Sequence, residues 1–155
     1  MKPIPETVAT FLRGRRFAVA GVSRSGRQPS NAIFKRLREC GYEVFAVNPA
    51  APRIGDEPCY PNLHAVPGPL DGVIIATHPA RASEVVQQCA ARGISRVWFH
   101  RSFGDGSVSP EALATCRANR IEPIVGGCPL MYCGGVDIFH KCMRWWLQNS
   151  GKIPG

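Results

Sequence analysis

The chain has 155 residues, of which 45% are hydrophobic and 19% are charged, and this predicts a single globular domain over residues 1–155. Its formal net charge is +8, so both a phosphorylated small molecule and a nucleic acid have to be considered as partners. No apolar stretch approaches the roughly 18 residues of a membrane span, no signal-like apolar core follows the N-terminus, and the 7 cysteines are scattered, so we expect a cytoplasmic setting.

Apolar runs alternate with stretches of helical periodicity along most of the chain. The predicted strands are 16–22, 43–49, 71–77, 96–100 and 122–127. The predicted helices are 5–13, 30–40 with Ser30 as N-cap, 79–92, 110 to about 119, and 136–149. The segment 50–70 is rich in proline and is predicted to be an irregular connection across the sheet.

The strands at 16–22, 71–77 and 122–127 are almost continuously apolar. Such strands are typical of parallel sheets that helices cover on both faces. Alternating strands and helices form right-handed βαβ units. The sequence therefore predicts an α/β fold, namely a doubly wound, mostly parallel, Rossmann-like sheet of about five strands with flanking helices.

Polar and glycine-rich segments follow every predicted strand. In an open α/β sheet, ligands bind beyond the carboxyl ends of the strands, so these segments are expected to form one site. They are GVSRSGRQPS after the first strand, Asn48-Pro49 after the second, Thr77-His78-Pro79 after the third, residues 100–104 after the fourth, and residues 126–129 after the fifth.

The segment GVSRSGRQPSN at 21–31 has the character of a phosphate-binding loop, but it fits neither common nucleotide motif. Arg27-Gln28 stands where a P-loop needs Lys followed by Ser or Thr, which excludes an NTPase. The loop lacks the second glycine of G-x-G-x-x-G, and the second strand does not end in an acid, which disfavours NAD. An NADP-dependent oxidoreductase remains an alternative, with Arg53 as the candidate for the extra phosphate.

A different ADP-containing ligand fits the same loop. Backbone N–H groups of residues 22–24 and the helix start near Ser30 are suited to a diphosphate. Arg24 and Arg27 are candidates for further phosphate contacts. Asn48 and Pro49 would then flank the adenosine.

Three segments carry a resemblance to a known family: FAVAGVSRSGRQPSNAIFKRLRECGYEVFAVNP, CYPNLHAVPGPLDGVIIAT and GGCPLMY. Over roughly residues 10–135 the chain resembles the stand-alone CoA-binding domains, which are similar to the N-terminal domain of succinyl-CoA synthetase alpha subunits. The resemblance implies a Rossmann-like fold that binds CoA at the switch point. It places Gly21, Val22, Ser23 and Ser30 near the diphosphate, Val47, Asn48 and Pro49 beside the adenosine, and Thr77 and Pro79 on the pantetheine side.

The segments WFHRSFGDGSVSP and VDIFHKCMRWW depart from the commoner family pattern. A synthetase also needs a phosphorylated histidine on a second domain, so we expect a module that binds CoA or an acyl-CoA without a complete catalytic set. His78 is assigned to the ligand site, and His78, His100 and His140 are candidate acid–base groups. Cys128 follows the fifth strand and is a candidate for a mixed disulfide with CoA.

Three further interpretations have weaker support. The spacing of Cys128, Cys133, His140 and Cys142 lacks the paired ligands of a structural zinc site. Nucleic-acid binding would use the basic stretches 13–16 and 35–38. The pair Trp145-Trp146 leaves a homodimer open.

Overall fold

Seven strands form one sheet that is parallel except at one edge. The computed structural model describes residues 3–101, 106–133 and 149–150. Its strands are β1 Arg16–Ala20, β2 Glu43–Val47, β3 Arg53–Ile54, β4 Glu57–Tyr60, β5 Gly72–Ile75, β6 Arg96–Phe99 and β7 Glu122–Val125. They lie in the order β3-β4-β2-β1-β5-β6-β7, and only the pairing of β3 with β4 is antiparallel. The predicted doubly wound α/β class is therefore confirmed.

The order of the strands places a topological switch point next to β1. From β1 the chain moves outward to β2 and β4, and it then crosses to β5 on the other side of β1. The last residue of β1, Ala20, pairs with Val47 of β2 and with Ile75 of β5. Ligands of doubly wound sheets bind at this kind of position, because the loops that follow the two flanking strands turn in opposite directions and leave a crevice.

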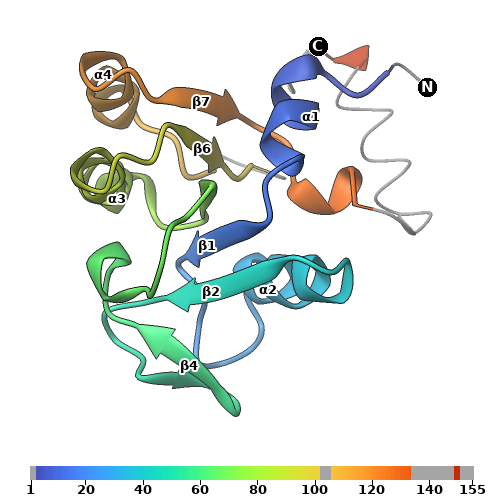
Figure 1. The fold of residues 1–155 in the computed structure, drawn as a ribbon, viewed down its shortest axis with the longest axis vertical. Coiled ribbons are helices and arrows are strands. Elements are labelled where there is room, and N and C mark those ends of the chain that lie inside the picture. The colour runs from blue at the N-terminus through green and yellow to red at the C-terminus, as the bar shows by residue number, and fades with distance from the viewer. Residues whose placement is uncertain (1–2, 102–105, 134–148, 151–155) are drawn as a thin grey trace.

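Helices cover both faces of the sheet (Figure 1). One face carries α1 Glu6–Leu12, α2 Pro29–Glu39 and the 3₁₀ turn η2 Pro129–Met131. The other carries α3 Pro79–Ala91, α4 Pro110–Ala118 and the 3₁₀ turn η1 Leu63–Ala65. No helix of the described ranges is both long and apolar enough to cross a membrane.

The burial of β1 explains its continuously apolar sequence. Phe17 and Val19 belong to the core beneath α1 and α2, whereas Ala18 and Ala20 belong to the core beneath α3 and η1. Successive side chains of a strand point to opposite faces, so a strand covered on both sides has no polar position to alternate with. On the first face Phe11 of α1 stacks on Phe17 at 4.9 Å between ring centroids, and this contact fixes the N-terminal helix to the sheet.

The structure corrects several boundaries. Each predicted strand is shorter at its carboxyl end, because residues such as Gly21 and Asn48 leave the sheet to form the loops of the site. The segment 50–70 holds β3 and β4, which are too short to show alternation in the sequence, so the sheet has seven strands instead of about five. Ser30 is not the N-cap of α2, since the helix begins one residue earlier at Pro29 and Gln28 is its N-cap. The predicted helix 136–149 lies, except for its last residue, outside the described residues.

Candidate functional site

A cavity of about 710 Å³ opens at the carboxyl ends of β1, β2, β5 and β6. This is the switch point of the sheet, where the sequence predicted a site. The lining residues come from the ends of β1 and β2, from the loops after these four strands, from Pro61 after β4, from the N-terminus of α2, and from α3 between Arg81 and Gln88. They are Ala20, Gly21, Ser23, Gln28, Pro29, Ser30, Val47, Asn48, Pro49, Ala50, Pro61, Ala76, Thr77, His78, Arg81, Glu84, Val85, Gln88, His100, Gly106 and Ser107.

Gly21 is the point where the chain leaves β1 against the end of β5. Its φ of +99° lies in the region that favours glycine, and a Cβ atom there would stand 2.6 Å from the carbonyl oxygen of Ala76. The Gly21 N–H donates to the Val47 carbonyl of β2 at 2.9 Å. Only glycine lets the three strand ends approach this closely, and the backbone is thereby exposed to the cavity.

The loop between β1 and α2 is held by hydrogen bonds of its own. The Ser23 N–H donates to Asn31 Oδ1 at 3.1 Å, and Asn31 Nδ2 donates to the Ser23 carbonyl at 2.7 Å. Ser30 Oγ donates to the Gly21 carbonyl at 2.8 Å. These bonds hold the loop against the first turn of α2.

The N-terminus of α2 faces the cavity through Gln28, Pro29 and Ser30. No side chain of the described residues caps this end of the 11-residue helix. Pro29 has no N–H, and the Asn31 N–H donates to the Gln28 carbonyl at 3.0 Å, so it is the positive end of the helix dipole that favours an anion at this position. The arrangement is therefore suited to a phosphate or diphosphate placed between the loop and the helix.

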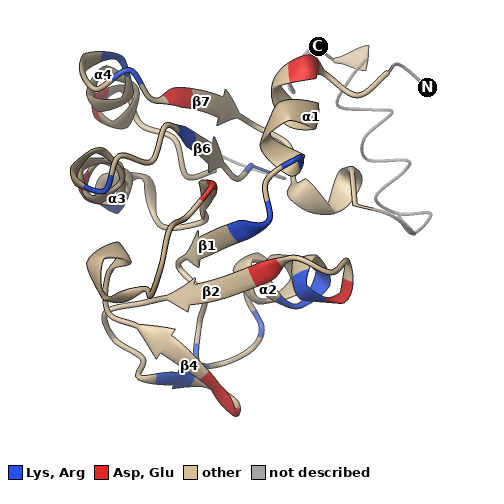
Figure 2. Cartoon of the chain, in the orientation of Figure 1, with Lys and Arg blue, Asp and Glu red and all other residues tan. Residues whose placement is uncertain are grey.

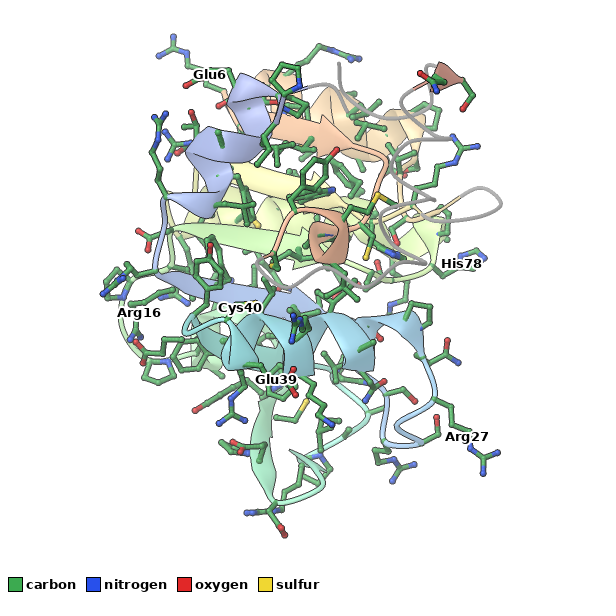
Figure 3. All side chains as sticks on the ribbon, turned by 90° about the vertical axis from the view of Figure 1, so that its right-hand side faces the viewer. Glu6, Arg16, Arg27, Glu39, Cys40 and His78 are labelled. Carbon is green, nitrogen blue, oxygen red and sulfur yellow. The ribbon has the colours of Figure 1, made fainter. Side chains whose placement is uncertain are left out.

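Arg24 and Arg27 stand outside the cavity wall, on the exposed part of the same loop. Neither is among the described lining residues of the cavity, and Arg27 lines an adjoining groove with Pro29 and Asn31. Figure 3 shows Arg27 on the outer side of the loop that precedes α2.

Asn48 organises the end of β2. Its Nδ2 donates to the Val22 carbonyl at 2.8 Å, and its Oδ1 accepts from the Ala50 N–H at 2.8 Å. This ties the β2 loop to the β1 loop and turns the chain at Pro49. Beside it, Pro49, Pro61 and Val85 give the cavity an apolar side on which a flat ring system can stack.

Thr77 and His78 continue the site after β5. The Thr77 hydroxyl oxygen is shielded from solvent and has no hydrogen-bond partner among the described residues. His78 is the N-cap of α3, and its Nδ1 accepts from the Ala80 N–H at 3.2 Å. The imidazole is exposed, and Figure 3 shows it on the same side of the molecule as Arg27.

His100 follows β6 and lines the cavity at 8% exposure. Burial lowers the pKa of its imidazole from 6.5 to about 4, because the charged form loses its hydration. The ring is therefore neutral at pH 7. Its backbone carbonyl accepts from the N–H of Ser107, another buried lining residue, at 3.1 Å.

The structure brings most of the predicted ligand residues to one cavity. Those that line it are Gly21, Ser23, Ser30, Val47, Asn48, Pro49, Thr77 and His78. Val22 is fully buried in the core beneath α2, and Pro79 is the first residue of α3. Cys128 is 3% exposed within the same core as Val22, so a mixed disulfide with CoA would require that core to open.

Sequence reasoning missed the contribution of α3. Arg81, Glu84, Val85 and Gln88 all line the cavity, and Arg81 pairs with Glu84 at 3.5 Å. Their spacing of three, four and seven residues puts them on one face of the helix that was predicted at 79–92. This face of the helix could have been predicted to line the cavity, because the helix begins at the expected site.

Residues that supported the alternative functions lie elsewhere or have partners. Arg53 is in β3 and donates to the Asp56 carbonyl, and it is not among the described lining residues. Five cations of the basic stretches pair with acids: Arg13 with Glu6, Arg16 with Glu43, Lys35 and Arg36 with Glu39, and Arg38 with Glu57. Figure 2 shows the basic positions spread over several elements rather than along one. His140 and Cys142, which entered the metal interpretation, lie outside the described residues.

Comparison with known proteins agrees with this geometry. Residues 15–134 match the family described as the CoA binding domain, which is well over half of the chain. The chain belongs to the CoA-binding domain family. The resemblance inferred from the sequence is thus confirmed.

This CoA-binding domain is also related to part of a larger enzyme. It is 35% identical over 79 residues to the ADP-forming acetate–CoA ligase II of Archaeoglobus fulgidus, and the match covers 50% of this chain but 12% of the ligase. The chain therefore spans only a small part of the length of the curated relatives it matches.

Two solved structures have the same fold. A hypothetical protein from Pyrococcus horikoshii is 23% identical with a TM-score of 0.72, and the match covers 83% of this chain and 93% of that one. A conserved hypothetical protein from Pyrococcus furiosus is 26% identical with a TM-score of 0.63, covering 73% of this chain and 93% of that one.

Proposed function

We propose that the cavity binds CoA or an acyl-CoA, with the diphosphate between the β1–α2 loop and the N-terminus of α2. The observation that carries this proposal is the pairing of a preformed loop at Gly21–Ser23 with an uncapped helix end beside one large cavity. Family membership supplies CoA as the ligand class, and the rim arginines Arg24 and Arg27 supply charge for a polyphosphorylated ligand.

The two arms of CoA extend from the diphosphate in opposite directions. The cavity likewise extends from the end of β1 toward β2 on one side and toward β5 and β6 on the other. The adenosine would lie toward β2, between Asn48-Pro49 and the apolar side formed with Pro61 and Val85. The pantetheine arm would then run toward Thr77 after β5 and His100 after β6. Strand neighbours are about 4.8 Å apart, so the cavity extends roughly 10 Å from the diphosphate position to β6.

The proposed role is that of a binding module. The related ligase is a much longer protein than this chain, and the described residues provide positions for a ligand without an evident nucleophile and base pair at the cavity. On this proposal the domain presents CoA or an acyl-CoA, or acts as an accessory to chemistry carried out elsewhere.

Calorimetric titration of ligand-free protein with CoA tests the proposal, with NADP titrated in parallel. We expect micromolar binding of CoA and no binding of NADP, because the loop after β1 lacks the second glycine of the dinucleotide-binding motif G-x-G-x-x-G. Binding of NADP without CoA would contradict the proposal. Absence of both would contradict it as well.

A further inference from the structure

One wall of the cavity is a face of α3. We call this face the α3 wall, and its members are Arg81, Glu84, Val85 and Gln88. Residues three, four and seven positions apart lie on the same side of a helix. Gln88 Oε1 accepts a hydrogen bond from the Leu63 N–H at 2.9 Å, which ties α3 to the 3₁₀ turn after β4. The α3 wall therefore borders the side of the cavity on which Pro61 also lies.

The α3 wall brings a positive charge to the cavity. Arg81 is the single Lys or Arg among the described residues that line it. Arg81 lies in the first turn of α3, and Val85 follows four residues later on the same side of the helix. Val85 and Pro61 form the apolar side proposed for the adenosine, so the guanidinium of Arg81 lies about one helical turn from that surface.

The ion pair that Arg81 makes is one that a ligand can replace. Arg81 Nη2 lies 3.5 Å from Glu84 Oε2, and the two side chains are 59% and 60% exposed. Exposed pairs of this kind contribute little to stability, because water screens the two charges. A phosphate carries more negative charge than a carboxylate and accepts two parallel hydrogen bonds from a guanidinium. A phosphate group at this wall would therefore take Arg81 from Glu84 at small cost.

We infer that Arg81 binds the 3′-phosphate on the ribose of CoA, and that the site thereby distinguishes CoA from dephospho-CoA. This rests on the proposed function, which places the adenosine beside the α3 wall. The ribose joins the adenine to the diphosphate and carries the 3′-phosphate separately. The two phosphate positions of the ligand are then served by different parts of the protein, the diphosphate by the β1–α2 loop and the 3′-phosphate by α3.

The test compares CoA with dephospho-CoA, which lacks only the 3′-phosphate. Calorimetry should give the wild type an affinity for CoA about tenfold higher than for dephospho-CoA, the order of one charge-assisted interaction. Arg81→Gln should lower the affinity for CoA to that for dephospho-CoA, and it should leave the affinity for dephospho-CoA unchanged. Arg81→Lys keeps the charge and should retain part of the preference. If Arg81→Gln keeps the full preference for CoA, the inference is wrong.

Two further variants separate a contact with the 3′-phosphate from a general effect of charge. Arg117→Gln is the matched control, because Arg117 is exposed in the last turn of α4, on the same face of the sheet, and is not among the described lining residues. It should leave both affinities unchanged. Glu84→Gln removes the carboxylate that competes for Arg81, so it should increase the preference for CoA about twofold or more. A Glu84→Gln variant with a smaller preference than the wild type would contradict the inference.

The two proposals fail in distinguishable ways. If neither CoA nor dephospho-CoA binds, the proposed function itself is wrong. If both bind the wild type with equal affinity, the proposed function stands and the role of Arg81 is wrong. If Arg81→Gln weakens both by the same factor, Arg81 acts on another part of the ligand and the assignment to the 3′-phosphate is wrong. The assignment is also wrong if Arg24→Ala or Arg27→Ala, and not Arg81→Gln, removes the preference for CoA.

Discussion

At the β1–α2 end of the cavity the polar groups bond to one another, whereas at the β5–β6 end a buried hydroxyl has no partner in the described protein. Asn31 bonds both backbone groups of Ser23, and Ser30 bonds the Gly21 carbonyl. At the other end the Thr77 hydroxyl is shielded from solvent without a partner in the described ranges, and His100 is buried and neutral at pH 7. The first end offers a fixed backbone, which suits a group common to many ligands, and the second holds a buried, neutral imidazole in place of a cation.

The largest effect is expected at Gly21, where the backbone after β1 lies close to the backbone after β5. Gly21→Ala should lower the free energy of unfolding by roughly 3 kcal/mol or more, because the new Cβ meets the Ala76 carbonyl oxygen and the backbone is left-handed. Gly26→Ala is the matched control, since Gly26 also has a positive φ but no atom within 4 Å of its Cβ position. It should lose only about 1 kcal/mol in the same denaturant titration. If both variants lost the same free energy of unfolding, the close contact between the ends of β1 and β5 would not contribute to stability.

The buried imidazole of His100, at the β5–β6 end of the cavity, should make the free energy of unfolding depend on pH. Unfolded His100 titrates near 6.5 and folded His100 near 4, so the unfolded state takes up the proton first as the pH falls. Stability should therefore decrease between about pH 6.5 and pH 4, by about 3 kcal/mol in all from this group, and this contribution should be constant below pH 4. Urea titrations at pH 7 and pH 4 check this, with His100→Gln as the comparison. The account is contradicted if the wild type and His100→Gln lose the same stability.

Ligand affinity tests whether the fixed end is a phosphate site. Arg24→Ala and Arg27→Ala should each weaken CoA binding by roughly 1–3 kcal/mol, the worth of a charge-assisted bond to phosphate. Arg13→Ala is a suitable control, because Arg13 is exposed, precedes β1 at the opposite edge of the sheet and, in the described part of the chain, pairs with the exposed Glu6. Calorimetry should show CoA affinity unchanged in this control. Unchanged affinity in both loop variants would remove the arginines from the site.

The smallest effect is expected from the hydrogen bonds that hold the loop between β1 and α2. Asn31→Ala removes two hydrogen bonds to Ser23 and should cost about 1 kcal/mol of stability and also weaken CoA binding. Asn31→Asp keeps the acceptor for the Ser23 N–H but sets a carboxylate oxygen against the Ser23 carbonyl oxygen, so it should cost at least as much. Chemical denaturation of the two variants measures the difference. If Asn31→Ala were as stable as the wild type and bound CoA equally well, the loop would not be held in the way described.

The sequence predicted the fold class and the edge of the sheet at which the cavity lies, because both follow from local patterns. Continuous apolar strands such as 16–22 indicate a sheet covered on both faces, and the glycine and polar residues after them indicate its carboxyl edge. The β3–β4 hairpin was missed because strands of two and four residues leave no readable alternation.

Other features of the site depend on three-dimensional packing that local patterns do not carry. The burial of Cys128 depends on how the segment after β7 packs beneath α2, and the unsatisfied hydroxyl of Thr77 depends on its neighbours from other loops. The lining face of α3 was visible as a helical spacing from Arg81 to Gln88, yet only the position of α3 beside the switch point gives that spacing a meaning.

The most direct test of the central claim is an NMR titration of the isotope-labelled protein with CoA, in which the backbone amide shifts are followed. We predict the largest shifts at Gly21, Ser23, Ser30 and Asn48, with smaller ones at Thr77 and His100, because CoA would lie across the carboxyl edge of the sheet. Shifts confined to the opposite edge, around Asp71 and the start of β1, or no shifts at millimolar CoA, would contradict the assignment of this cavity as the CoA site.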